Sequence, residues 1–259
     1  MKSDLIVTRL DDRGEAGCVA YVVVNDPEHR NALGRRGKED LIAAFRTLAD
    51  DERLRVAVLT GAGDASFIGG ANIKEMSEVD VEVAEDISTK THLACDAIRR
   101  LPVPVIARVN GYCLGAGMEL AAACDMRVGA DTARFGMPEV KFGIPSGMEA
   151  CLLPGLIGWG KTRELVLTGE MIDANEAYRC GFLNRLVASA ELDAVVEKWI
   201  AAIFSAGPRA VRIQKRLLQD WERMTIADAV RQGIAAIVEA RQTDEPKRLM
   251  EAFVNRTKR

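Results

Sequence analysis

Hydrophobic and polar positions at the start of the chain follow the two-residue period of β-strands. Residues 5–10 and 18–24 are rich in strand-forming residues, and apolar side chains alternate along the second run. The stretch between them, 11–17, is polar and carries two glycines, which suit a turn. We predict that a β-hairpin opens the fold.

Beyond the hairpin, helix-period and strand-like segments alternate. We predict short buried strands at 56–61, 103–109, 126–129 and 183–187. We predict helices over 37–51, about 80–100, a stretch that begins near Ala116 or Gly117, 161–167, and 173–180 with Asp173 as its cap. Such alternation is typical of an α/β core.

After residue 190 nearly every segment has the pattern of a helix. Helices are predicted at about 190–205, 208–221, 225–241 and 246–256. A helical C-terminal quarter on an α/β core often forms a subunit interface.

The composition is that of an ordinary globular protein. With 259 residues, of which 48% are hydrophobic, the chain can bury a full core. Its 35 basic and 38 acidic residues provide no global attraction to nucleic acid or to an anionic membrane. A local excess of basic residues after Arg241 could contact a phosphate group. No run of about 20 apolar residues could span a bilayer.

The six cysteines, at positions 18, 95, 113, 124, 151 and 180, include no Cys-x-x-Cys pair. Most have apolar neighbours, which indicates reduced core thiols rather than a disulfide or zinc framework. Only His29 and His92 could add imidazole ligands, and the N-terminus lacks a long apolar signal core. We therefore expect a cytoplasmic protein without a metal site.

The strongest chemical signal is the segment 110–120, NGYCLGAGMEL, which joins a glycine-rich turn to a helix start. Small residues let a ligand approach main-chain N–H groups, and the positive end of a helix favours negative charge. Glu119 falls in the first turn, and a second acid, Glu139, follows in the sequence FGMPE. Small residues at 69–71 could expose another N–H and complete an oxyanion hole. The alternative interpretations are that the glycines of 110–120 only allow close helix packing, and that the segment containing 69–71 is an ordinary flexible loop.

Other motifs point to different chemistry. Residues 155–162 match the phosphate-binding pattern Gly-x4-Gly-Lys-Thr, but only a short stretch ending in Pro154 precedes them, where a buried strand is required. A glycine-rich turn capping a helix is the alternative. Residues 115–120 begin like a dinucleotide fingerprint, but Leu120 stands where glycine or alanine is needed. No Gly-x-Ser-x-Gly elbow supports a serine hydrolase.

Taken together, these pieces resemble the crotonase, or enoyl-CoA hydratase/isomerase, superfamily. The matching landmarks are PEHRNAL at 27–33, VLTGAG at 58–63, FIGGANIKEM at 67–76, the segment 110–120, CDMR at 124–127, ARFGMPE at 133–139, LTG at 167–169 and AF at 252–253. They extend from about residue 5 to residue 256.

The resemblance implies an α/β fold: a spiral of ββα turns over residues 1–190, with a helical region over 191–259 for trimerisation and closure of the coenzyme A site. It implies a homotrimer or a dimer of trimers. It also implies an oxyanion hole made by the backbone N–H groups of Ala71 and Ala116. Glu119 matches the acid that activates water at the β-carbon, and Glu139 the acid that exchanges the α-proton.

The same resemblance implies a coenzyme A site along the 28–32 segment and the loop after Ala71, with further contacts from the C-terminal tail. The matching residues are Glu28, Arg30, Ala32, Asn72, Ile73, Phe253 and Arg256.

Several positions depart from the common family pattern. Ala116 replaces glycine, and Asn72 replaces aspartate. The loop 143–149, which borders the acyl site in the family, is one residue shorter between its glycine and proline and adds a third acid, Glu149. A helix-start role is the plain interpretation of Glu149. The acyl group is therefore left open.

The sequence favours reversible syn addition of water to a trans-2-enoyl-CoA, with no metal or redox cofactor. Two carboxylates favour hydration over double-bond isomerisation, for which one acid is sufficient in the family. The alternatives are an isomerase, a specialised hydroxyacyl-CoA dehydratase, and a scaffold that binds acyl-CoA or a protein partner without turnover.

Overall fold

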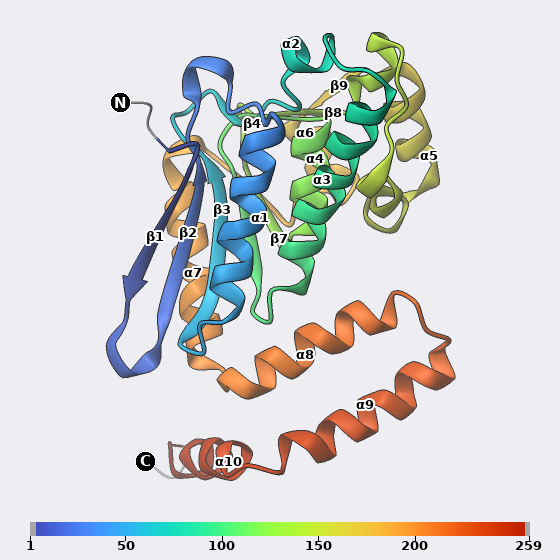
Figure 1. The fold of residues 1–259 in the computed structure, drawn as a ribbon. Helices are drawn as coiled ribbons and strands as arrows, with labels where there is room; N and C mark the ends of the chain where they lie inside the picture. The colour runs from blue at the N-terminus through green and yellow to red at the C-terminus, as the bar shows by residue number, and fades with distance from the viewer. Residues whose placement is uncertain (1–3, 257–259) are drawn as a thin grey trace.

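The computed structural model describes residues 4–256 (Figure 1). Its main sheet has the order β1-β2-β3-β5-β7-β10, in which β1 and β2 are antiparallel and the remaining neighbours are parallel. The bounds are Ile6–Asp12, Cys18–Val24, Leu54–Gly61, Val105–Val109, Met126–Ala130 and Arg185–Val187. The predicted hairpin and the four predicted strands are thereby confirmed to within a few residues.

A second, smaller sheet of three-residue strands has the order β4-β6-β8-β9. Its strands are Ser66–Ile68, Tyr112–Leu114, Arg134–Gly136 and Met171–Asp173. Each of β3, β5 and β7 runs into the next strand of this second sheet, so the chain winds as successive ββα turns. The spiral that the resemblance implied is confirmed. The short strands themselves were not predicted, because three residues are too few to establish a period.

The helices follow the predicted pattern closely. They are α1 Arg35–Ala49, α2 Ile73–Met76, α3 Val81–Arg100, α4 Ala116–Ala123, α5 Leu153–Thr168, α6 Ala174–Arg179, α7 Leu192–Ser205, α8 Pro208–Trp221, α9 Ile226–Ala240 and α10 Glu245–Arg256. Short 3-10 helices are η1 Gly14–Ala16, η2 Pro27–His29, η3 Pro138–Phe142, η4 Met148–Leu152 and η5 Ser189–Glu191. Asp173 caps α6, as predicted, by accepting a hydrogen bond from the Glu176 N–H.

The phosphate-binding interpretation of residues 155–162 is wrong. These residues lie inside α5, which follows η4 rather than a strand, and Gly158 with φ of 72° divides α5 into two helical segments. The second segment contains the predicted helix 161–167. Lys161 forms ion pairs with Glu164 and Glu176, each at 2.7 Å, so its ammonium group is paired with carboxylates of the protein itself.

The main core lies between the sheets and their helices. All eight residues of β3 are buried, as expected for an interior strand of a parallel sheet. In Figure 1, α1 lies in front of the main sheet and α7 behind it. Leu192, Val196 and Ile200 of α7 belong to the main core. α7 therefore packs with the main core, whereas the division at 190 and 191 stays a prediction.

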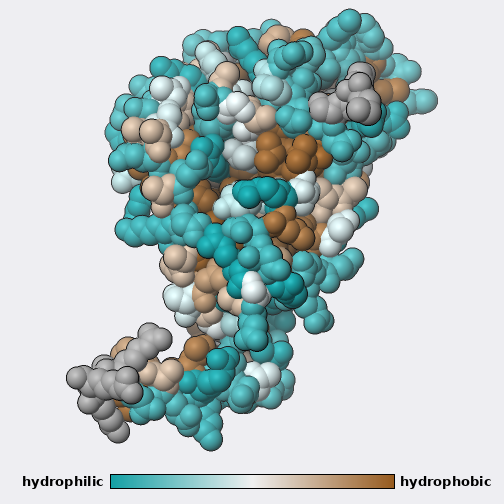
Figure 2. Space-filling view, turned by 90° about the vertical axis from the view of Figure 1, so that its left-hand side faces the viewer, coloured by the Kyte–Doolittle hydropathy of each residue, from teal (hydrophilic) through white to brown (hydrophobic). Residues whose placement is uncertain are grey.

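The last three helices stand apart from the body. Figure 2 shows the C-terminal part of the chain as a narrower projection below a rounded body. One anchor is Lys215 of α8, which is buried and donates hydrogen bonds to Asp125 Oδ2 at 2.8 Å and Val103 O at 2.9 Å. A small second core joins α8 to α9 through Ile213, Leu217 and Ala236.

The remaining expectations concern thiols and membrane spans. All six cysteines are free thiols, and four of them are buried, as predicted. Within residues 4–256, no helix combines the length and apolar character needed to cross a bilayer.

Candidate active site

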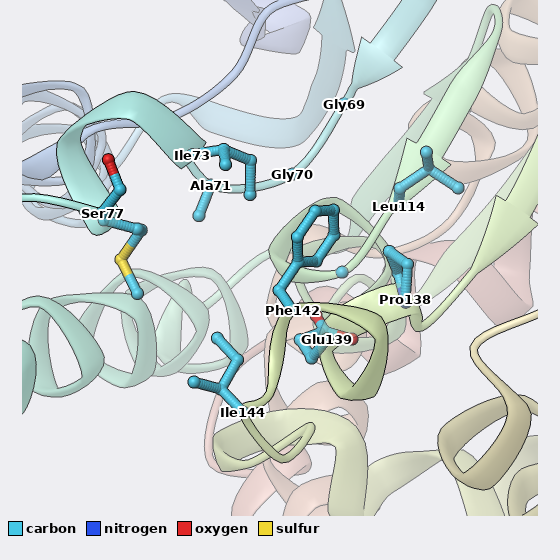
Figure 3. Close-up of a pocket in the computed structure, with 12 residues that line it drawn as sticks. Gly69, Gly70, Ala71, Ile73, Ser77, Leu114, Pro138, Glu139, Phe142 and Ile144 are labelled. Atoms are coloured by element: carbon cyan, nitrogen blue, oxygen red, sulfur yellow. The ribbon is translucent and has the colours of Figure 1, made fainter.

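A cavity of about 420 Å³ lies where three segments of the spiral meet (Figure 3). The loop after β4 forms one wall, the end of β6 with Gly115 a second, and η3 with the following residues a third. Most of the lining is apolar, including Phe142 and Ile144, and Glu139 is the ionisable residue among the described residues that line it. The cavity therefore suits an apolar group beside one carboxyl.

The loop carrying Ala71 is held by the chain segment that precedes α1. Gly69 N–H donates to Arg30 O at 2.9 Å, and Leu33 N–H donates to Gly70 O at 2.9 Å. A bridge pairs Leu33 with Ala71. These bonds align the backbone at 69–71 along the 30–33 segment and place Ala71 at the cavity wall.

The start of α4 forms the opposite wall. Gly115, with φ of 51°, precedes Ala116, the first residue of the helix, and Gly115 N–H donates to Gly136 O at 2.9 Å. The first N–H groups of a helix have no acceptor within it, and the positive end of the helix dipole points in the same direction as these N–H groups. Ala71 and Gly115 line one cavity, so the two segments required for an oxyanion hole lie together.

Glu139 projects from η3 toward this helix start. A Cβ atom built on Gly115 would lie 2.4 Å from Glu139 Oε1, which shows how closely the carboxyl approaches the helix. Ser146 Oγ donates to Glu139 Oε2 at 2.7 Å and fixes the other oxygen. Sequence reasoning missed Ser146. The signal that could have identified it is a hydroxyl side chain in the loop 143–149, which departs from the family pattern.

Glu119 lies deeper, in the first turn of α4, and is 1% exposed. Its Oε1 accepts a hydrogen bond from Ala150 N–H at 3.0 Å, whereas Oε2 has no hydrogen-bond partner among the described residues. Burial raises the pKa of Glu119 to about 8, with the charges of Glu139 and Glu149 adding to the rise and the Ala150 N–H opposing it. Glu119 is therefore mainly protonated at neutral pH.

The predicted coenzyme A residues near the N-terminus lie beside the cavity. Glu28 and Arg30 belong to the turn that holds residues 69–71, and the Arg30 guanidinium lies 5.1 Å from the centre of the Tyr112 ring. Ala32 follows in the same segment. Asn72 caps α2 by accepting a hydrogen bond from Glu75 N–H at 3.2 Å. Ile73 is half exposed at the cavity wall.

The predicted tail residues are not at this cavity. Phe253 is exposed on α10, which Figure 1 places at the end of the molecule opposite α2. Arg256 ends α10, and its side chain lies outside the described part of the chain. One copy of the chain therefore does not bring Phe253 and Ala71 together.

Glu149 is more than a helix-start residue. It does lie in the first turn of η4, but its side chain is buried and its Oε1 lies 2.7 Å from His92 Nδ1. Within the described chain, no group of three or more histidine, cysteine, aspartate or glutamate residues has the arrangement of a metal site.

We predict that Gly115→Ala destabilises the protein more than Gly14→Ala does. Both glycines have positive φ, but Gly115 combines φ of 51° with ψ of −121°, a conformation outside the left-handed helical region that costs a residue with a side chain about 1–3 kcal/mol. Only at Gly115 does the new Cβ meet Glu139 Oε1, since nothing lies within 4 Å at Gly14. Urea unfolding of the two variants measures the difference. Equal losses would contradict the strained backbone and the close approach at Gly115.

Comparison with known proteins agrees with this fold. The family described as enoyl-CoA hydratase/isomerase matches residues 14–259. The chain is 33% identical to the short-chain-enoyl-CoA hydratase of Clostridium acetobutylicum over 243 residues, and 34% identical to the crotonyl-CoA hydratase of Syntrophomonas wolfei over 241 residues. Each match covers 93% of both chains.

A solved structure described as enoyl-CoA hydratase from Mycobacterium smegmatis superposes with a TM-score of 0.92 at 31% identity. It covers 98% of this chain and 97% of that one. The chain therefore belongs to the enoyl-CoA hydratase/isomerase family, the crotonase superfamily.

Proposed function

We propose that this protein is an enoyl-CoA hydratase that reversibly adds water, in the syn sense, to a trans-2-enoyl-CoA. The observation that carries the proposal is one apolar cavity walled by the Ala71 loop, the start of α4 and Glu139. The names of two relatives, a short-chain-enoyl-CoA hydratase and a crotonyl-CoA hydratase, support a short acyl group.

Addition of water to the conjugated thioester moves negative charge onto the thioester oxygen. In this proposal the N–H groups of Ala71 and Ala116 donate to that oxygen and stabilise the enolate-like state, each contributing about 10²–10³ in rate. Ionised Glu119 takes a proton from the water that attacks the β-carbon, and protonated Glu139 gives its own proton to the α-carbon. Proton exchange with solvent then returns both acids to their starting states. Positioned acid–base groups contribute about 10²–10⁴.

The thioester is the substrate, and the proposed reaction uses no metal or redox cofactor. We propose that the coenzyme A portion lies along Glu28, Arg30 and Ala32 and past Asn72 and Ile73. Because Phe253 and Arg256 lie on a helix remote from the cavity, they would reach the nucleotide only from a neighbouring copy.

Assembly into a trimer or a dimer of trimers is supported by the surface of α9. Ile226, Val230, Ile234 and Ile237 are exposed at spacings of three and four residues, which places them on one face of the helix. A contiguous exposed apolar face marks an interaction surface.

Double-bond isomerisation is the second candidate. It is favoured by the burial of Glu119, since of the two acids only Glu139 reaches the cavity wall. Dehydration of a hydroxyacyl-CoA is the reverse of hydration and needs a protonated Glu119. Incubation of the protein with a panel of enoyl- and hydroxyacyl-CoAs, followed by mass analysis, distinguishes water gain, water loss, isomerisation and a non-catalytic scaffold.

Glu139→Gln should lower hydration by at least about 10²-fold, the lower end for acid–base catalysis. The amide keeps the size of the side chain but cannot exchange the α-proton. Glu85→Gln is the matched control, because Glu85 is exposed on α3. The rate is measured by loss of the conjugated thioester absorbance. Unchanged turnover in Glu139→Gln would remove this residue from the mechanism.

The two directions of the reaction should respond to pH in parallel. Hydration needs ionised Glu119 with protonated Glu139, and dehydration needs the opposite arrangement of the same single proton, so both directions require a singly protonated pair. Because the net reaction takes up no proton, kcat/KM should fall above about 8 in both directions, where Glu119 loses that proton. Initial rates in both directions from pH 5.5 to roughly 9 test this. A kcat/KM for hydration that rises through pH 8 would contradict the assignment of Glu119.

Ile234→Glu should reduce the molecular mass measured by light scattering. A buried unpaired charge at a subunit interface is costly, whereas Ile234 is exposed in a single copy, so the fold itself should survive. Val81→Glu is the control, since Val81 is exposed on a different helix. A monomeric parent protein, or an unchanged mass in Ile234→Glu, would refute an interface at α9.

A further inference from the structure

A second buried acid stands behind Glu119 and is not used by the proposed reaction. Glu149 is 6% exposed, and its Oε2 has no hydrogen-bond partner among the described residues. Its Oε1 lies 2.7 Å from Nδ1 of His92, a residue of α3 whose side chain is about half exposed. A carboxylate can only accept, so Nδ1 carries the proton and donates it.

Glu149 is linked to Glu119 through the backbone. The next residue, Ala150, donates its N–H to Glu119 Oε1 at 3.0 Å. The His92 contact anchors the side chain of Glu149 to α3, and Glu149 and Ala150 are both in η4. The same 3-10 helix therefore fixes one oxygen of Glu119 and carries a carboxyl close to it.

Other titratable groups also face Glu119. Lys38 comes from α1, Cys95 from α3 and Glu139 from η3. Lys38 is buried and donates to Ile87 O at 3.4 Å, and burial lowers its pKa to about 8. Burial, with Glu149 and Glu119 adding to the effect, raises the pKa of the Cys95 thiol well above its usual range. Within this cluster, Glu149 is the buried carboxyl whose hydrogen-bond partner, His92, has a half-exposed side chain.

We propose that Glu149, held by His92, is a positioning residue for the hydration reaction. It anchors the backbone N–H that orients Glu119, and its negative charge disfavours ionisation of Glu119. This inference deepens the proposed function and rests on it. Glu149 need not touch the substrate, since it acts through Glu119.

The sign of the charge effect follows from the geometry. A second carboxylate near a buried one favours the protonated form, and Glu149 is among the groups that raise the pKa of Glu119. Removal of the charge of Glu149 should therefore let Glu119 ionise at lower pH. Loss of the Ala150 N–H bond alone would raise the pKa of Glu119, whereas general unfolding around Glu119 would lower it by removing the burial. The charge effect is therefore measured only in variants that unfold in urea as the parent protein does.

The test compares four variants with the parent protein. Glu149→Gln removes the charge and keeps the shape of the side chain. His92→Phe removes the donor, so that the buried Glu149 becomes neutral, whereas His92→Asn keeps an N–H close to the position of Nδ1. Glu85→Gln removes an exposed charge from the same helix as His92. His92 is half exposed, so its variants retain the fold even if Glu149→Gln does not.

Two measurements are made on each variant. Infrared pH titration follows the protonated carboxyl stretch of Glu119, identified by its absence in Glu119→Gln, and needs no turnover. The pH profile of kcat/KM for hydration follows the same group in the reaction. Glu149→Gln and His92→Phe should shift both midpoints roughly one unit lower, while His92→Asn and Glu85→Gln should leave them unchanged.

The outcomes separate this inference from the proposed function. Unchanged or higher midpoints in Glu149→Gln and His92→Phe overturn the role of Glu149, whatever the activity. A parent protein that converts none of the acyl-CoA panel overturns the proposed function. In that case an infrared midpoint that still shifts would establish the coupling of Glu149 and Glu119 but refute its role in hydration.

Discussion

The site depends on one close approach between two backbones. Gly117, in the first turn of α4, lies against the end of β4, where a Cβ atom would stand 2.1 Å from Ile68 O. Any side chain at this position would push the helix away from the strand. Ala116 immediately precedes Gly117, and Ala71 follows Ile68 by three residues, so this contact sets the separation of the two proposed oxyanion donors.

Two buried amides hold the neighbouring loop in the same region. Asn110 donates to Gly61 O at 3.0 Å and Ser66 O at 3.2 Å, and Asn31 donates to Ala62 O at 3.0 Å and Ser66 O at 2.8 Å. Backbone carbonyls where β3 leads into β4 thereby receive hydrogen bonds from side-chain amides in place of a neighbouring strand. Buried polar groups require such partners. Asn110 follows β5 and bonds to the loop between β3 and β4, so these bonds join two successive turns of the spiral beside the cavity.

The two acids occupy different environments although both lie beside the start of α4. Glu139 lies at the cavity wall and is fixed by a hydroxyl, whereas Glu119 is enclosed by protein and has one backbone donor. Separate surroundings are the physical means by which two carboxyls of the same type can take different roles in one reaction. Glu149 and His92 extend this cluster to the surface. The groups that surround Glu119 come from four elements, α1, α3, η3 and η4.

The long elements and the α/β class could be predicted from the sequence, because α1 and α3 have enough residues to show a helical period and β3 is a continuous, mainly apolar run that ends at a glycine. The sequence also indicated the glycine-rich helix start and the two acids of the proposed reaction. Only the tertiary structure showed the second sheet, the place of α7 in the main core, and the contacts of Ser146 and His92. Three-residue strands carry no period, and a hydrogen bond between residues far apart in the chain leaves no local pattern. The distance of Phe253 from the cavity was likewise decided by packing, since the direction in which α8 leaves the body is set by contacts such as Lys215 with Asp125.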